Sequence, residues 1–219
     1  MFFLFFLILL LILILICKML QKKNITDKIN KCYANIVTPE EAVLMQNLLI
    51  AWSEVAEKFD ISWSACAGTA LGARRHKGRI PWDDDIDITI ALADVEKLPK
   101  AFLELKAYEI DTSKFWGGYK IFYPQYSKNC KYYHKKYGWG WPFIDLFVKP
   151  NDQNCAPLED DEQLEWIPFD NIVIPVIKNG YRGITNLKKK GLMDSMLDTG
   201  YRHRIESFIP TKCQPIKKN

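Results

Sequence analysis

The chain begins with a segment that has no polar positions. Residues 2–16 are an unbroken run of Phe, Leu and Ile, and Cys17 extends it. The run is apolar on every helical face, and its length is close to the ~17-residue lower limit for crossing a bilayer. No Lys or Arg precedes it, and the following Cys17-Lys18-Met19-Leu20 is not typical of a signal-peptide cleavage site. We therefore predict a retained transmembrane helix, with a cleaved signal peptide as the alternative.

Hydrophobic residues at helical spacing follow from position 38. Thr38-Pro39-Glu40-Glu41 is typical of a helix start, because Thr38 can be the N-cap and Glu41 can complete a capping box. The apolar stripe that follows predicts an amphipathic helix packed on a core; it consists of Leu44, Leu48, Trp52, Val55 and Phe59. We expect this stripe to serve packing rather than binding.

Beyond the first helix, the pattern alternates between helical and strand periods. Residues 85–92 read D-I-D-I-T-I-A-L, so that isoleucines alternate with polar side chains, as in a strand with one polar face. Other compact apolar segments predict strands at 62–67, 143–148 and 172–177. Pro175 places the last of these at a sheet edge, because proline cannot donate to a strand ladder. Helices are expected at 70–75, from about 94 with a break at Pro99, and over 181–207.

Charge divides the chain further. The formal net charge of +4 lies within residues 18–31, which hold five lysines and one aspartate, so the remainder is neutral. A neutral domain is a poor nucleic-acid binder, because phosphate neutralisation needs excess Lys and Arg. We predict a transmembrane anchor (1–18), a basic stalk (19–37) and one α/β (α+β) domain (38–219). The six cysteines include no C-x-x-C pair, so a zinc cluster is not expected, although disulfides are possible.

The orientation of the domain across the membrane stays open. The lysines that follow the apolar run favour a cytoplasmic domain. Asn24-Ile25-Thr26 is a glycosylation sequon, which would matter only in a secretory lumen.

A cluster of four carboxylates is the most informative chemical feature. Asp83, Asp84, Asp85 and Asp87 fall within five positions, and Asp85 and Asp87 project from the same strand face. Such carboxylates repel one another, and a divalent cation would remove the repulsion. A solvated acidic turn and a purely structural metal site are alternatives. An EF-hand loop starting at Asp83 fails, because its sixth position is Ile88 rather than Gly.

Two further elements complete a candidate site. The pair Gly68-Thr69 can let backbone amides and a hydroxyl approach phosphate oxygens. Asp145 is the only charge in an apolar strand, and such a charge is almost never left unpaired. Asp145 is therefore the candidate third metal ligand, with pairing to a buried Lys or Arg as the alternative. Asp-x-Asp on a strand behind a Gly-Ser/Thr turn is the arrangement of nucleotidyltransferase folds, in which carboxylates hold Mg²⁺ or Mn²⁺.

The stretch from Ala67 to Ile88, AGTALGARRHKGRIPWDDDIDI, resembles the LicD/fukutin family. It is similar to the family pattern G-T-x-L-G-x-x-R-x-x-x-x-I-P-W-D-D-D-I-D, and residues 143–147 are similar to the second acidic strand of the family. The resemblance covers roughly residues 40–150 and, more loosely, 166–182. Near the C-terminus, Gly200-Tyr201-Arg202 stands where family members often have a Tyr-Gly-Asp-Trp-like motif, without its acid.

The resemblance implies a nucleotidyltransferase-like mixed sheet flanked by helices, and a phosphotransferase. A CDP-activated alcohol such as CDP-choline or CDP-ribitol would be the donor, a glycan hydroxyl the acceptor, and CMP the leaving product. Asp85 and Asp87 would hold metal with help from Asp83, and Asp145 would be the third ligand or the base. Arg74 or Arg75, with Gly68 and Thr69, would contact donor phosphates. A lumenal domain in the Golgi or endoplasmic reticulum is expected from the family.

Residues 115–141 are rich in Tyr, Trp and Lys. They could stack a cytosine or sugar ring, or form an ordinary hairpin whose aromatics pack on the sheet. Two other functions also remain open: transfer of a whole nucleotide by the same fold, and an inactive membrane-anchored glycan-binding or accessory protein.

Overall fold

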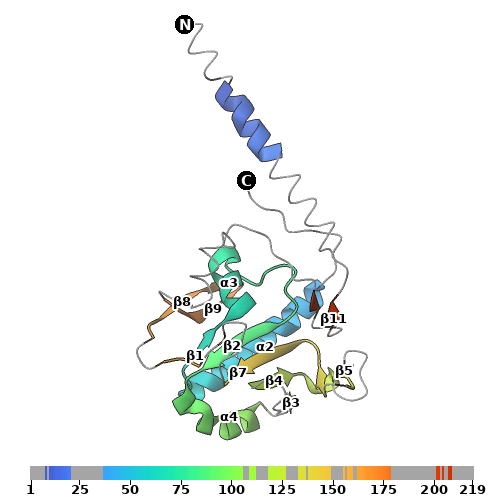
Figure 1. Ribbon diagram of the computed structural model, residues 1–219, viewed down its shortest axis with the longest axis vertical. Helices are drawn as coiled ribbons and strands as arrows, with labels where there is room; N and C mark the ends of the chain where they lie inside the picture. Colours follow the sequence, from blue (N-terminus) through green and yellow to red (C-terminus); the bar gives the residue numbers. More distant parts are fainter. Residues whose placement is uncertain are drawn as a thin grey trace.

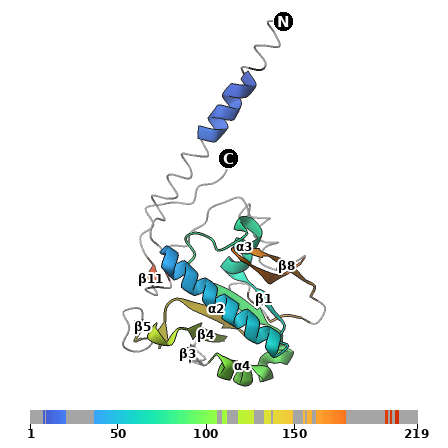
Figure 2. The same ribbon diagram turned by 180° about the vertical axis from the view of Figure 1, so that it is seen from behind.

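The computed structural model describes residues 8, 10–20, 37–105, 109–111, 118–126, 133–136, 138–148, 155, 157–159, 162–178, 201–202, 204 and 207–208. Within these residues the architecture is mixed α/β, with helices flanking one central sheet (Figures 1 and 2). This confirms the predicted fold class in its coarse form.

The central sheet has seven strands of mixed direction. In sheet order they are β3 (Glu109–Asp111), β4 (Gly118–Phe122), β7 (Phe143–Phe147), β2 (Ile86–Ile90), β1 (Trp63–Ala65), β9 (Ile172–Ile177) and β8 (Leu164–Phe169). β2 runs parallel to β7 and antiparallel to β1. The acidic strands β2 and β7 are therefore direct neighbours in the middle of the sheet.

The helices expected before residue 105 form close to where the pattern predicts them. α2 (Pro39–Lys58) begins with a complete capping box between Thr38 and Glu41 and lies across one face of the sheet (Figure 2). Its buried face centres on Leu48 and Trp52. α3 (Ala67–His76) begins three residues earlier than expected, and a 3₁₀ helix, η1 (Leu92–Lys97), precedes α4 (Leu98–Glu104) near Pro99.

Two predictions about the later part of the chain are wrong. β9 is not an edge strand, because β8 pairs along its outer side over the whole length of β9. β1 pairs with β9 only at Ala65↔Val176. Because so few backbone hydrogen bonds form on that side, the missing N–H of Pro175 is tolerated there. The end of the expected C-terminal helix is instead a small hairpin, in which β10 (Tyr201–Arg202) pairs with β11 (Ser207–Phe208). Residues 181–200 lie outside the described residues.

The described part of the apolar N-terminus is helical at residues 8 and 10–20, and its large hydrophobic side chains are exposed. No helix among the described residues is both long and apolar enough to cross a membrane. Most of the predicted stalk, including the Asn24 sequon, lies outside the described residues.

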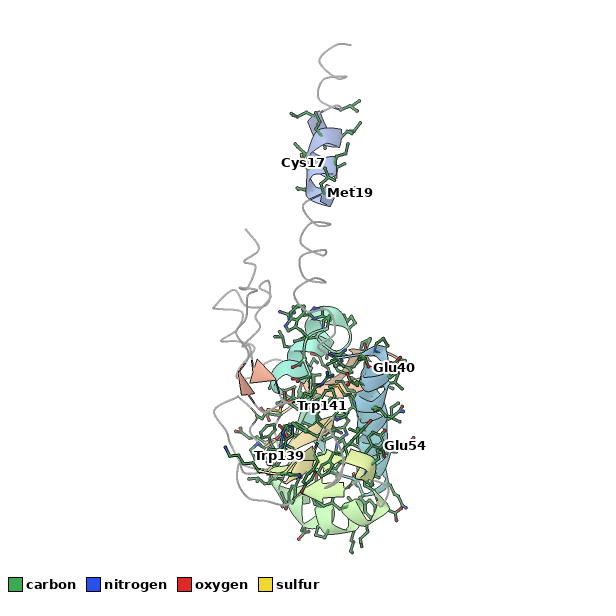
Figure 3. The ribbon with its side chains drawn as sticks, turned by 90° about the vertical axis from the view of Figure 1, so that its right-hand side faces the viewer. Cys17, Met19, Glu40, Glu54, Trp139 and Trp141 are labelled. Carbon is green, nitrogen blue, oxygen red and sulfur yellow. A yellow bond between two sulfur atoms is a disulfide. The ribbon has the colours of Figure 1, made fainter. Side chains whose placement is uncertain are left out.

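The structure describes part of the aromatic stretch, residues 115–141. η2 (Pro124–Tyr126) follows β4, and β5 (Tyr133–His134) pairs with β6 (Trp139–Gly140) as a short hairpin. Trp139 and Trp141 are buried in a small apolar cluster with Phe122 and Phe143. Figure 3 shows Glu40 and Glu54 on the α2 side of the domain, and Trp139 toward the opposite side. Where the structure describes this stretch, its tryptophans pack as core residues.

Candidate metal and phosphate site

Three carboxylates converge where β2 and β7 lie side by side. Asp85 directly precedes β2, Asp87 lies within β2, and Asp145 lies within β7. Parallel pairing sets Asp87 opposite Asp145, and the two-residue period of a strand puts Asp85 on the same face as Asp87. One oxygen from each carboxylate lies within 4.8 Å of the others. The structure thus brings together three of the four predicted metal ligands.

The chemistry of this donor set fits a divalent cation. The three aspartates are 5%, 5% and 6% exposed, so their negative charges repel one another with little solvent screening. Carboxylate oxygens are the donors that Mg²⁺ and Mn²⁺ prefer. A cation held among them would offset the repulsion that otherwise makes the cluster costly.

The carboxylate of Asp145 also pairs with a buried lysine. The Lys120 Nζ on β4 lies 2.5 Å from the Asp145 Oδ1, and Lys120 is 4% exposed. The sequence left two roles open for Asp145, a third metal ligand or the partner of a buried Lys or Arg. In the structure Asp145 lies in the acidic cluster and also pairs with a buried lysine. Lys120 itself was missed, although a lone lysine in the apolar strand GYKIF was the available signal.

Asp83 lies outside the carboxylate cluster and against the start of α3. A Cβ added at Gly68 would meet the Asp83 Oδ2 at 2.5 Å, so the absence of a side chain at Gly68 makes room for Asp83. Gly68 lies within the first turn of α3 rather than in a turn before it. The fourth predicted metal ligand is thus placed beside the predicted phosphate-binding residues.

Thr69 supports the metal-binding strand directly. Its Oγ1 accepts a hydrogen bond from the backbone N–H of Asp87 at 2.8 Å, and the residue is buried. The backbone N–H of Cys66 donates to the Asp87 carbonyl at 3.0 Å. The start of α3 therefore fixes the backbone on both sides of Asp87.

The two candidate arginines have different surroundings. The Arg74 guanidinium donates to the Ile177 carbonyl at 2.5 Å and forms an ion pair with Glu165, so it ties α3 to β8 and β9. Burial lowers the pKa of Arg75, and the negative charge of Asp83 opposes that shift. Of these two arginines, Arg75 is the one whose interaction with Asp83 in the acidic loop suits a phosphate-binding role.

A third arginine, Arg79, was missed. Its Nη1 donates to the Ile80 carbonyl at 2.9 Å and to the Asp83 carbonyl at 2.6 Å. Burial lowers its pKa, while Asp83, Asp170 and Asp84 act in the opposite direction. Arg79 therefore holds the acidic loop in shape, a role that depends on backbone carbonyls and leaves no signature in a sequence.

His76 follows Arg75 in the last turn of α3. Burial, with the nearby positive charge of Arg75, lowers the pKa of His76 to about 4. The Arg75 Nε donates to the His76 Nδ1 at 3.3 Å, which requires that nitrogen to be unprotonated. His76 is thus a neutral acceptor that helps to orient Arg75.

Asp84 is a structural member of the acidic run. It is 2% exposed; its Oδ2 accepts from the Arg204 backbone N–H at 3.1 Å, and its carbonyl accepts from the Trp141 Nε1 at 2.6 Å. Asp84 therefore fastens the loop to two distant segments.

A disulfide lies next to the site. Cys66, the N-cap residue of α3, is bonded to Cys155 across a sequence separation of 89 residues. The Leu158 N–H close to Cys155 donates to the Ile90 carbonyl at the end of β2. The bond thus links the helix that supports Asp87 to a segment that contacts the same strand.

The fold and the site place this protein among α/β domains in which the central strands carry a carboxylate cluster beside the start of a helix. A family model described as LicD/FKTN/FKRP, nucleotidyltransferase domain, matches residues 60–177, more than half of the chain. The chain belongs to this family.

Two individual proteins are also similar. Over 49 residues the chain is 47% identical to the lipopolysaccharide cholinephosphotransferase LicD of Haemophilus influenzae; the match covers 22% of this chain and only 18% of that relative. A crystal structure of the lincosamide antibiotic adenylyltransferase LnuA with lincomycin bound matches 68% of this chain and 85% of that chain, at 15% identity and a TM-score of 0.37. The similarity to that structure is weak.

Proposed function

We propose that this protein is a metal-dependent phosphotransferase. It would move a phospho-alcohol group, of the phosphocholine or ribitol/glycerol phosphate type, from a CDP-activated donor to a glycan hydroxyl and release CMP. The observation that carries the proposal is the buried cluster of Asp85, Asp87 and Asp145 within the domain that defines the family. The matching segment of a lipopolysaccharide cholinephosphotransferase supports the choice of group and of acceptor.

The arrangement assigns a role to each group. Asp85, Asp87 and Asp145 would hold Mg²⁺ or Mn²⁺, which supplies charge neutralisation at the donor diphosphate. The acceptor oxygen would form a bond to the phosphorus that bears the alcohol, while the bond from that phosphorus to CMP breaks and CMP takes the electron pair. As the alternative to its role as the third ligand, Asp145 would be the base that accepts the hydroxyl proton. Arg75 would bind donor phosphate, because a guanidinium offers two parallel donors.

The disulfide bears on where the reaction takes place. Disulfides persist in oxidising compartments and are rare in the cytosol. The bond between Cys66 and Cys155 supports a domain on the oxidising side of a membrane, for which the apolar N-terminal segment would be a single-pass anchor. The flanking lysines favour the opposite orientation.

The proposal is tested by following CMP release. The full chain in detergent would be incubated with Mg²⁺, lipopolysaccharide and either CDP-choline or CDP-ribitol, and free CMP and phosphorylated glycan would be measured by chromatography. We expect both products from the wild type, and a rate at least ~100-fold lower from Asp87→Asn, because charge stabilisation of this kind is worth about 10²-fold or more.

Other products would redirect the assignment. CMP attached to the acceptor would indicate transfer of a whole nucleotide. An Asp87→Asn variant as active as the wild type would contradict a role for the carboxylate cluster. No product from either donor in a well-folded protein would favour a binding or accessory protein.

A further inference from the structure

Lys120 is a buried ammonium beside the carboxylate cluster. Its Nζ lies 2.5 Å from the Asp145 Oδ1, 3.4 Å from the centre of the Phe143 ring and 4.7 Å from that of Trp139. A lysine is almost never fully buried unless it is paired, because removing an ammonium from water is costly. Two aromatic faces and a carboxylate offset that cost here.

The position of Lys120 follows from strand register. Lys120 on β4 pairs with Asp145 on β7, and Asp145 pairs with Asp87 on β2. One row across three neighbouring strands thus carries a cation and two of the three clustered carboxylates. The pairing register of the sheet therefore fixes the position of Lys120 beside Asp145.

Lys120 places one buried positive charge against the carboxylate cluster. That charge makes the cluster less negative than it would be with a neutral side chain at this position. Attraction to a metal ion grows with the charges on both sides, so a less negative cluster favours a trivalent over a divalent ion by a smaller factor. The neighbouring Asp83 and Asp84 interact with another cation, Arg79.

We propose that Lys120 determines the charge selectivity of the metal site, and that it does so as a positioning residue on Asp145. By engaging the Oδ1 it orients that carboxylate, and its positive charge reduces the preference of the cluster for trivalent over divalent ions. The inference rests on the proposed metal site and adds to it a residue that is not itself a ligand.

The test compares two ions in the same protein. The full chain in detergent is titrated with Tb³⁺, followed by the luminescence that nearby tryptophans sensitise, and Mn²⁺ is then measured by competition. The readout is the ratio of the two dissociation constants, which does not depend on the fraction of protein that is folded. Lys120→Met keeps the length of the side chain and suits the apolar surroundings. Lys97→Met is the matched control, because it removes an ion pair with Asp94, 2.7 Å long, that lies on η1.

We expect Lys120→Met to shift the ratio toward Tb³⁺ by about tenfold or more, because losing one positive charge favours the more highly charged ion. Lys97→Met should leave the ratio unchanged. If Lys120→Met does not fold, Lys120→Gln, which retains a donor for Asp145 without the charge, should shift the ratio in the same direction.

Two results would overturn the inference in distinguishable ways. Wild-type binding that Asp87→Asn abolishes, together with an unchanged ratio in both Lys120 variants, would make Lys120 only a packing residue and leave the metal site standing. No binding of either ion by the wild type, or binding that Asp87→Asn leaves intact, would remove the metal site itself and Lys120's role with it.

Discussion

At the scale of single residues, two glycines of α3 meet different neighbours. A Cβ at Gly68 would lie 2.5 Å from the end of a side chain, the Asp83 Oδ2, whereas a Cβ at Gly72 would lie 2.7 Å from a backbone oxygen, that of Gly78. A carboxylate can rotate away at small cost, but a backbone carbonyl moves only with its loop. The two positions therefore constrain the domain for different reasons, Gly68 through the site and Gly72 through packing.

Substituting each glycine with alanine should separate these reasons. We expect Gly72→Ala to lower the free energy of unfolding by about 1–3 kcal/mol, because it overpacks a backbone contact. Gly68→Ala should change stability little and should instead displace Asp83 and weaken donor binding. Urea denaturation measures the first effect, and the KM for the CDP donor measures the second. Equal losses of stability in the two variants would contradict this distinction.

At the scale of elements, the disulfide joins the start of α3 to the segment that contacts the end of β2. It closes a loop of 89 residues that includes β2 and β7. Cross-linking a long loop stabilises a fold by about 2–4 kcal/mol, largely by restricting the unfolded chain. The bond thus helps to hold the elements that carry the carboxylates.

Removing the bond should weaken the whole domain. We expect the double variant Cys66→Ser/Cys155→Ser to lose about 2–4 kcal/mol in the free energy of unfolding. The exposed Cys17, which the structure describes as free, offers the matched control Cys17→Ser, which should lose nothing. Thermal unfolding with and without dithiothreitol checks the same point, since reductant should lower the midpoint of the wild type by more than that of the double variant. Identical midpoints under both conditions would show that the bond contributes no stability.

The elements that could be predicted from the sequence are those whose signals are local. The capping box at Thr38 and the alternation around Asp87 specify α2 and β2 within a few residues. The pairing of β8 with β9, the choice of Lys120 as the partner of Asp145 and the choice of Cys155 as the partner of Cys66 could not be predicted, because each depends on how distant segments meet in the fold. The Asp85–Asp87 part of the cluster was thus visible in one segment, whereas its counter-charge became visible only in the sheet.

At the scale of the whole molecule, distant parts of the chain meet around the acidic loop. The Arg204 guanidinium pairs with Glu41 at the start of α2 and lies 4.3 Å from the Trp141 ring, while its backbone N–H donates to Asp84. The first helix of the domain and the C-terminal hairpin are therefore joined at the loop that leads into β2.

The central claim is a metal-dependent site for a CDP-activated donor. It is tested most directly by the unfolding temperature of the full chain in detergent with CDP, ADP, GDP or UDP, each with and without Mg²⁺. At about 100 times its dissociation constant, a ligand adds about 2.7 kcal/mol, or about 5–10 °C for a domain of this size. We predict that CDP with Mg²⁺ gives this shift, that CDP alone does not, and that Asp85→Asn abolishes it. A well-folded protein that no nucleotide stabilises, or that CDP stabilises equally without metal, would contradict the account.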